Sequence, residues 1–257
     1  MVRNFLHHGS FFKVALSILT LSLTQVSNYV HAGAEEDWFR AIRHNNLPLI
    51  EQLLSHGAKV NLAADDGKTA LMAAAGAGEA KLAQAMIAAG ADVNAVNQRG
   101  GTALMYAATD GNPATLNALL SHGAAVNARA RNGWTALTLA SARGHAGIVG
   151  RLLAAGADAN VSDIYGWTPL MRAVYEDRFE VVRELLGHKS LQLNAQDDRG
   201  ETALHFAAAK GSFEIVKLLL DHGAEARATD GSGRTPATVA AAEGHAALAE
   251  FLKRLIH

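Results

Sequence analysis

The chain has 257 residues, of which 49% are hydrophobic, so it is long enough to bury a substantial core. Its 23 lysine and arginine residues nearly balance 24 aspartate and glutamate residues, which excludes the basic surface of a general nucleic-acid binder. Cysteine is absent, which excludes disulfides, thiolate metal sites and cysteine-based catalysis. Abundant alanine, 24 glycines and only 4 prolines favour short helices separated by turns.

The first 34 residues have the layout of a secretory signal peptide. Arg3 and Lys13 lie before or beside the apolar run VALSILTLSLT (14–24), and small residues follow that run. Cleavage after Ala32 or after Ala34 would fit this pattern. The apolar run is about half of the roughly 20 residues that span a bilayer, so we favour a cleaved segment over an uncleaved membrane anchor.

From residue 35 onward the sequence repeats with a period of about 33 residues. The stretch LLSHGA occurs at 53–58 and again at 119–124, and half of that offset aligns the sequence between and beyond them. The aligned units are 35–67, 68–100, 101–133, 134–166, 167–200, 201–233 and 234–257, with one extra residue in the fifth. Seven units therefore account for the chain after the expected signal segment.

Each unit predicts two short helices followed by a loop. A threonine before an alanine-rich run is expected to cap the first helix, at Thr69, Thr102, Thr135, Thr168, Thr202 and Thr235. A glycine about nine residues later is expected to end that helix, with Asn45 and Asp177 in its place in two units. The second helix has leucine and valine at helical spacing and ends at His-Gly-Ala or Ala-Gly-Ala, before a loop rich in Asn, Asp and Gly.

A unit of this size cannot bury both helices alone, so neighbouring units must stack into an elongated array. The period, the T-P-L or T-A-L start, A-A-x-x-G, L-L-x-x-G-A and the asparagines at 61, 94, 127, 160 and 194 closely resemble the ankyrin repeat. The resemblance covers essentially all of 35–257. It implies an all-α solenoid of about seven stacked helix-turn-helix units with projecting hairpin loops, whose first helices and loop tips line a concave face.

The chain departs from this repeat pattern at both ends and once inside. Glu36 and Trp38 replace Thr and Leu in the first unit, which suits a polar cap, and Ala237 replaces leucine in the last. In the fifth unit Lys189 occupies the position of the capping glycine, beside the extra residue. We therefore expect a different loop geometry there.

Four histidines share one position of the repeat: His56, His122, His188 and His222. Alanine fills that position elsewhere, and histidines two units apart would lie on the order of 20 Å from each other, too far to share one metal ion. We interpret these histidines as caps at helix C-termini. No cofactor, metal or catalytic residue is expected, because an array spreads apart the side chains that chemistry needs to converge.

The surface holds the remaining candidates. Five are expected on loop tips, in a mixture of aromatic and arginine side chains typical of a binding hot spot: Arg99, Arg131, Trp134, Tyr165 and Trp167. Four more are expected on the first helices, facing the same concavity: Tyr106, Arg172, Tyr175 and Glu176. Alternatively, the tryptophans pack against neighbouring loops and only stiffen the array. If they bind, replacing Trp134 and Trp167 by alanine abolishes partner capture without unfolding the chain.

The resemblance implies a non-catalytic scaffold that binds a partner protein through its concave face and loop tips. The partner is not identified by the sequence, and we expect a monomer that binds no nucleic acid and no membrane after signal cleavage. Alanine-rich repeats behind a short signal favour the periplasm of a Gram-negative bacterium. The alternatives are a secreted effector that binds host proteins and, from another class, a metal-dependent or enzymatic protein.

Overall fold

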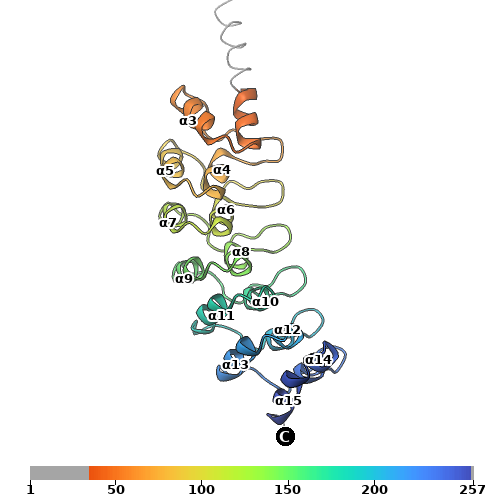
Figure 1. Ribbon diagram of the computed structural model, residues 1–257. Coiled ribbons are helices and arrows are strands. Elements are labelled where there is room, and N and C mark those ends of the chain that lie inside the picture. The colour runs from red at the N-terminus through yellow and green to blue at the C-terminus, as the bar shows by residue number, and fades with distance from the viewer. Residues whose placement is uncertain (1–34, 256–257) are drawn as a thin grey trace, which may run out of the picture.

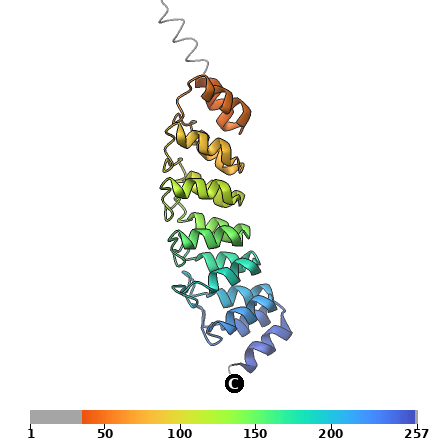
Figure 2. The ribbon, with the colours of Figure 1, turned by 90° about the vertical axis from the view of Figure 1, so that its left-hand side faces the viewer.

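A computed structural model describes residues 35–255, which form one elongated stack of helix pairs (Figure 1). The N-terminal pair and the C-terminal pair lie at opposite ends of the stack, and the view in Figure 2 shows the pairs following one another in chain order. The expected signal segment, 1–34, lies outside the described residues. The predicted all-α solenoid of stacked helix-turn-helix units is confirmed, and no strand occurs within 35–255.

The helices alternate between two rows. A helix over residues 35–43 and the even-numbered helices form the row of first helices: α4 (Ala70–Gly76), α6 (Ala103–Asp110), α8 (Ala136–Arg143), α10 (Pro169–Tyr175), α12 (Ala203–Lys210) and α14 (Pro236–Ala242). The odd-numbered helices form the row of second helices: α3 (Leu47–Ser55), α5 (Ala80–Ala88), α7 (Pro113–Ser121), α9 (Ala146–Ala154), α11 (Phe179–Leu186), α13 (Phe213–Asp221) and α15 (Ala246–Arg254). The connecting loops project beside the first helices (Figure 1).

The threonines cap the first helices as expected. The hydroxyl of Thr102 accepts a hydrogen bond from the backbone N–H of Met105, and equivalent bonds occur at Thr69, Thr135, Thr168 and Thr235. At Thr202 the backbone N–H donates to the ring of His205 instead. Each bond satisfies a backbone group that the helix itself leaves without a partner.

The first helices end in left-handed residues. Gly111 and Gly144 have φ of 88° and 85°, and Asn45 and Asp177, which replace the glycine, adopt the same conformation at φ of 51° and 55°. At Gly111 no other residue would fit easily, because a Cβ atom there would lie 2.6 Å from the ring of His145. The turn glycines therefore serve both the backbone geometry and the close approach of the next helix pair.

The core runs along the stack between the two rows of helices. Each first helix packs on the first helix of the next pair, through buried alanines such as Ala107 and Ala140 and buried leucines such as Leu104 and Leu137. The small alanine side chains allow this close packing, while the second helices contribute larger side chains such as Leu152. Because each pair contacts mainly its neighbours, the core is continuous along the stack but has no single centre.

A ladder of asparagines joins each loop to the next. The side-chain amide of Asn127 donates to the carbonyl oxygen of Gly156 at 3.0 Å, and its oxygen accepts from the N–H of Asp158 at 2.9 Å. The same pair of bonds recurs, with other partners, at Asn61, Asn94, Asn160 and Asn194. These bonds fix the spacing between neighbouring loops.

The histidines act as caps, with one exception. Ring Nδ1 donates to the carbonyl oxygen four residues earlier at His56, His122 and His222, at 2.7, 2.8 and 2.8 Å. His188 differs, since its Nδ1 lies 3.1 Å from the hydroxyl of Ser190. The fifth unit also has the altered loop expected there: α11 ends with Gly187 in right-handed geometry, and Lys189 is not among the residues with positive φ.

Residues 35–255 contain neither a candidate metal cluster nor a candidate membrane-spanning helix. No group of three or more His, Cys, Asp or Glu side chains there is arranged to hold a metal ion. No helix in that range is long and apolar enough to cross a membrane.

Candidate functional site

The nine residues predicted for partner binding lie on the loops and first helices of four consecutive helix pairs. Two recurring positions supply four of them: the residue before the capping threonine, occupied by Trp134 and Trp167, and the fourth residue of the first helix, occupied by Tyr106 and Arg172. The others are loop-tip residues Arg99, Arg131 and Tyr165, with Tyr175 and Glu176 at the end of α10. The structure divides the nine into a packed cluster, an exposed patch and a pocket.

Asp163 is the centre of the packed cluster, although the sequence did not single it out. Its side chain is fully buried, and its Oδ1 accepts the backbone N–H of Tyr165 at 2.9 Å and of Trp167 at 3.1 Å. Its Oδ2 accepts the indole N–H of Trp134 at 3.1 Å and pairs with the guanidinium of Arg172. One carboxylate thus holds its own loop, the preceding loop tip and helix α10 together.

The environment of Asp163 keeps it ionised. Burial by itself raises the pKa of Asp163, but the hydrogen bonds from Arg172 and from the two backbone N–H groups outweigh that effect. The pKa of Asp163 therefore lies below its ordinary value. A negative charge is fixed beneath the aromatic layer at neutral pH.

Arg172 is enclosed by aromatic rings. Its guanidinium carbon lies 4.1 Å from the ring centre of Trp167 and 4.9 Å from that of Trp134, and only 16% of its side chain is exposed. Trp167 in turn packs on Phe206 and Tyr175, with ring centres 4.5 and 5.1 Å away. Both tryptophans are therefore part of the packing between neighbouring loops and helices.

These contacts change what is expected of the tryptophan double variant. Removing Trp134 and Trp167 takes away both indole rings that pack against the Arg172 guanidinium and one hydrogen bond to Asp163. We now expect that variant to lose stability, so loss of partner capture in it would not identify a binding residue.

The exposed patch lies on the next loop tip and the end of α10. Tyr165 is 61% exposed and its neighbour Ile164, which is not one of the nine, is 55% exposed. Tyr175 is 41% exposed and lies under the ammonium group of Lys210 at 4.2 Å, and Glu176 beside it is exposed as well. Of the nine residues, Tyr165 presents the largest apolar surface without a packing role.

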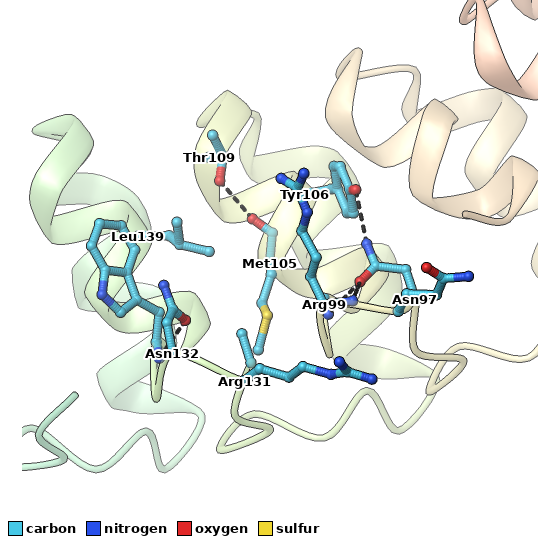
Figure 3. A pocket seen from close by; sticks show the side chains of 12 residues that line it. Asn97, Arg99, Met105, Tyr106, Thr109, Arg131, Asn132 and Leu139 are labelled. Atoms are coloured by element: carbon cyan, nitrogen blue, oxygen red, sulfur yellow. Dashed lines mark hydrogen bonds between the residues drawn. The ribbon is translucent and has the colours of Figure 1, made fainter. Parts of the chain in front are cut away.

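A pocket of about 440 Å³ brings together the three remaining residues, Arg99, Tyr106 and Arg131 (Figure 3). Trp134 of the packed cluster also lines it. It lies between α6 and α8 and the two loops that precede them, and Met105 and Leu139 add apolar surface to it. The hydroxyl of Tyr106 accepts a hydrogen bond from the amide of Asn97 at 3.0 Å, which fixes the ring at the edge of the pocket (Figure 3).

The residues that the sequence analysis missed line this pocket or support it. Asn97, Asn132, Met105 and Leu139 line it, and Asp163 holds the Trp134 indole in place. A signal for Asp163 was present, because Asp or Asn recurs at that position of the repeat, at Asn97, Asp197 and Asp230. Nothing in one unit alone marks the pocket, since its walls come from three successive units, 68–100, 101–133 and 134–166.

Comparison with known proteins gives matches along the whole described chain. A family model described as ankyrin repeats (3 copies) matches residues 38–130, 123–197 and 189–256. Ankyrin repeat domain-containing protein 63 of Mus musculus is 42% identical over 77 residues, which is 30% of this chain and 20% of that protein. Tyrosine-protein kinase HTK16 of Hydra vulgaris is 38% identical over 93 residues, and the match covers 32% of this chain and 12% of the kinase. The matches thus span about a fifth or less of these relatives' own length.

Two solved structures share the architecture over most of the chain. The ankyrin repeat domain of human ASB11 has a TM-score of 0.70 and 28% identity, and the match covers 79% of this chain and 90% of that one. The ankyrin repeat domain of Bcl-3 has a TM-score of 0.71 and 29% identity, covering 85% and 97%. The chain belongs to the ankyrin repeat family.

Proposed function

We propose that this protein is a non-catalytic scaffold that binds a partner protein through its concave face and loop tips. Ankyrin repeat domains are protein-interaction scaffolds, and this chain carries that fold from end to end of its described residues. One observation carries the proposal furthest: arginine and aromatic side chains follow one another on one side of the stack, from Tyr106 to Tyr175.

The energetics of such a surface support binding. Hot spots in protein interfaces are enriched in Trp, Tyr and Arg, and a buried one contributes about 2 kcal/mol or more. Here a rigid frame holds these side chains: the Asn97 amide holds Tyr106, and the Asp163 carboxylate holds Trp134. A partner would therefore meet side chains that lose little conformational entropy on binding.

We propose further that the protein acts after export, in the periplasm, with the extracellular space as the alternative location. The support is the charged start, apolar run and small residues of 1–34. Cell fractionation and the mass of the exported chain test this proposal. A chain that keeps its first residues and stays in the cytoplasm would contradict it.

Affinity capture with the full chain tests the binding function. Capture from the source organism is compared between the wild type and a Tyr165→Ala variant, because Tyr165 is exposed and its removal leaves the packed cluster intact. We expect one or a few proteins to be captured by the wild type and depleted with the variant. If no protein is enriched over an unrelated helical repeat used as bait, the scaffold function is wrong.

A metal-dependent function is the competing hypothesis from the sequence. Calorimetric titration of the full chain with zinc separates the two hypotheses. Saturable binding of zinc at one ion per chain would contradict a scaffold without a metal site.

A further inference from the structure

We propose that the pocket between α6 and α8 docks an acidic segment of the partner protein, which inserts one aromatic side chain between Tyr106 and Trp134. Carboxylates flanking that side chain would pair with Arg99 and Arg131. This inference rests on the scaffold function proposed above, and it specifies the chemistry of the partner.

The repeat itself shows what the pocket lacks. One period of 33 residues further along, the equivalent space is filled by Trp134, Asp163 and Arg172, which bond to one another. In the pocket the corresponding residues are Gly101, Ala130 and Leu139. An indole is replaced by a hydrogen atom, a carboxylate by a methyl group, and a guanidinium by a shorter apolar side chain. The pocket is the space that these three replacements leave.

The walls suit an aromatic side chain. Tyr106 and Trp134 contribute rings from successive units. Met105 and Leu139 contribute apolar surface to the same pocket (Figure 3). The volume of about 440 Å³ lies within the range of about 300–1,000 Å³ that is usual for ligand pockets. In the neighbouring unit the chain's own Trp134 occupies the matching position, so a partner's aromatic ring would reproduce a packing that this fold already uses.

The charges at the mouth of the pocket favour carboxylates. Arg99 and Arg131 are exposed, and a backbone hydrogen bond of 2.9 Å from the Arg131 N–H to the Arg99 carbonyl joins the two loop tips. Within residues 35–255 neither guanidinium has a carboxylate within 4.0 Å.

Three arginines further along the chain, one on helix α10 and two on later loops, are already paired with acids of this chain. Arg172 pairs with Asp163, and Arg199 and Arg234 both pair with Glu201. Arg99 and Arg131 are therefore two adjacent positive charges beside an apolar pocket, a combination that complements an acidic peptide better than a nucleic acid.

Peptide selection tests the docking site directly. A library of random peptides is selected on the purified full chain and depleted on a Leu139→Trp variant, in which the new ring fills the pocket. The variant should fold, because the equivalent position in other units holds the large side chains of Tyr106, Arg172 and Phe206. We expect the enriched peptides to share one aromatic residue with Asp or Glu on both sides.

The binding of an enriched, fluorescein-labelled peptide is then measured by fluorescence anisotropy. We expect Arg99→Glu with Arg131→Glu to weaken it at least about tenfold, and alanine at the aromatic position of the peptide to weaken it similarly. Arg143→Glu with Arg151→Glu changes the net charge equally at exposed residues outside the pocket, and should leave the affinity unchanged. Circular dichroism confirms that each variant is folded.

Several results would overturn the docking site: no enriched peptide, enriched peptides without acidic residues, or equal affinity for the Arg99/Arg131 variant and its charge-matched control. Preference for a single-stranded oligonucleotide over every peptide would overturn it too. If the full chain captures a partner whose binding is insensitive to Leu139→Trp and to the arginine variant, this site is wrong but the scaffold function stands. Absence of any captured protein counts against the scaffold function itself.

Discussion

Asp163 and Arg172 form an ion pair that joins the loop after α9 to the first helix of the next pair, beneath the rings of Trp134 and Trp167. The carboxylate also accepts three N–H groups from two successive loops. Because this one side chain bonds to partners from several elements, its removal should destabilise the packing between the two helix pairs. The stability of the array and the shape of the face that we propose for partner binding are thus linked at this one residue.

Replacing Asp163 by alanine should lower the free energy of unfolding by about 3 kcal/mol, because it leaves the enclosed Arg172 guanidinium without its counter-ion. Urea denaturation followed by circular dichroism measures the change. Asp198→Ala, an exposed position on the following loop, is the matched control and should stay within about 0.5 kcal/mol of the wild type. If both substitutions lower the unfolding free energy equally, the contacts of Asp163 do not stabilise the fold more than those of an exposed aspartate.

The same carboxylate should make stability depend on acid pH. Because the pKa of Asp163 is lower in the folded chain than its ordinary value, the unfolded chain takes up the proton first as the pH falls. The stabilisation from ionised Asp163 is therefore complete above about pH 5 and is lost as the pH drops below about 4.

The variant Asp163→Asn isolates this effect, since an amide oxygen can still accept the two backbone N–H groups, as Asn97 does two units earlier. The difference in unfolding free energy between wild type and variant should be constant from about pH 5 to 7 and should shrink at about pH 3. Urea denaturation at several pH values measures it. If the difference in unfolding free energy does not change with pH, folding does not lower the pKa of Asp163.

The sequence predicts the frame better than the surface because the frame depends on local chemistry. A capping threonine, a left-handed glycine and a helix of alanines act within about ten residues, so they can be recognised from spacing alone. The departures from the repeat pattern are predicted as well. Asn45 and Asp177 adopt the left-handed conformation of the glycine that they replace, and the loop around Lys189 differs from the others at the extra residue.

The roles of the surface residues are harder to predict from the sequence because their contacts join different units. Whether Trp167 is a binding or a packing residue depends on Phe206, 39 positions further along, and on Arg172 in the helix that follows it. The pocket arises from Gly101, Ala130 and Leu139, each unremarkable in its own unit. These features can be predicted from the sequence only when equivalent positions are compared between units whose stacking is already known.

The asparagine ladder should contribute measurably even though it lies at the surface. Asn127→Ala removes one donated and one accepted hydrogen bond to the next loop, so we expect a loss of about 1–2 kcal/mol in unfolding free energy. Asn117→Ala, on the exposed side of α7, removes only a long contact of 3.4 Å to Arg151 and serves as the control. A loss at Asn127 no larger than at Asn117 would mean that water replaces the ladder bonds without cost.

Tyr165 and Trp167 are two residues apart and should separate binding from stability. Trp167→Ala removes a ring that packs on Arg172, Phe206 and Tyr175, and should cost about 3 kcal/mol of unfolding free energy. Tyr165→Ala removes a side chain that is 61% exposed, and should change stability by less than about 0.5 kcal/mol.

Partner capture should respond differently to the same two substitutions. Tyr165→Ala should reduce capture while the chain unfolds at the same urea concentration as the wild type, because the exposed ring is free to be buried by a partner. Trp167→Phe keeps a ring beside Arg172 and should restore much of the stability that Trp167→Ala loses. Capture that is unchanged by Tyr165→Ala, yet abolished in the folded Trp167→Phe variant, would assign the contact to Trp167 and remove Tyr165 from the binding surface.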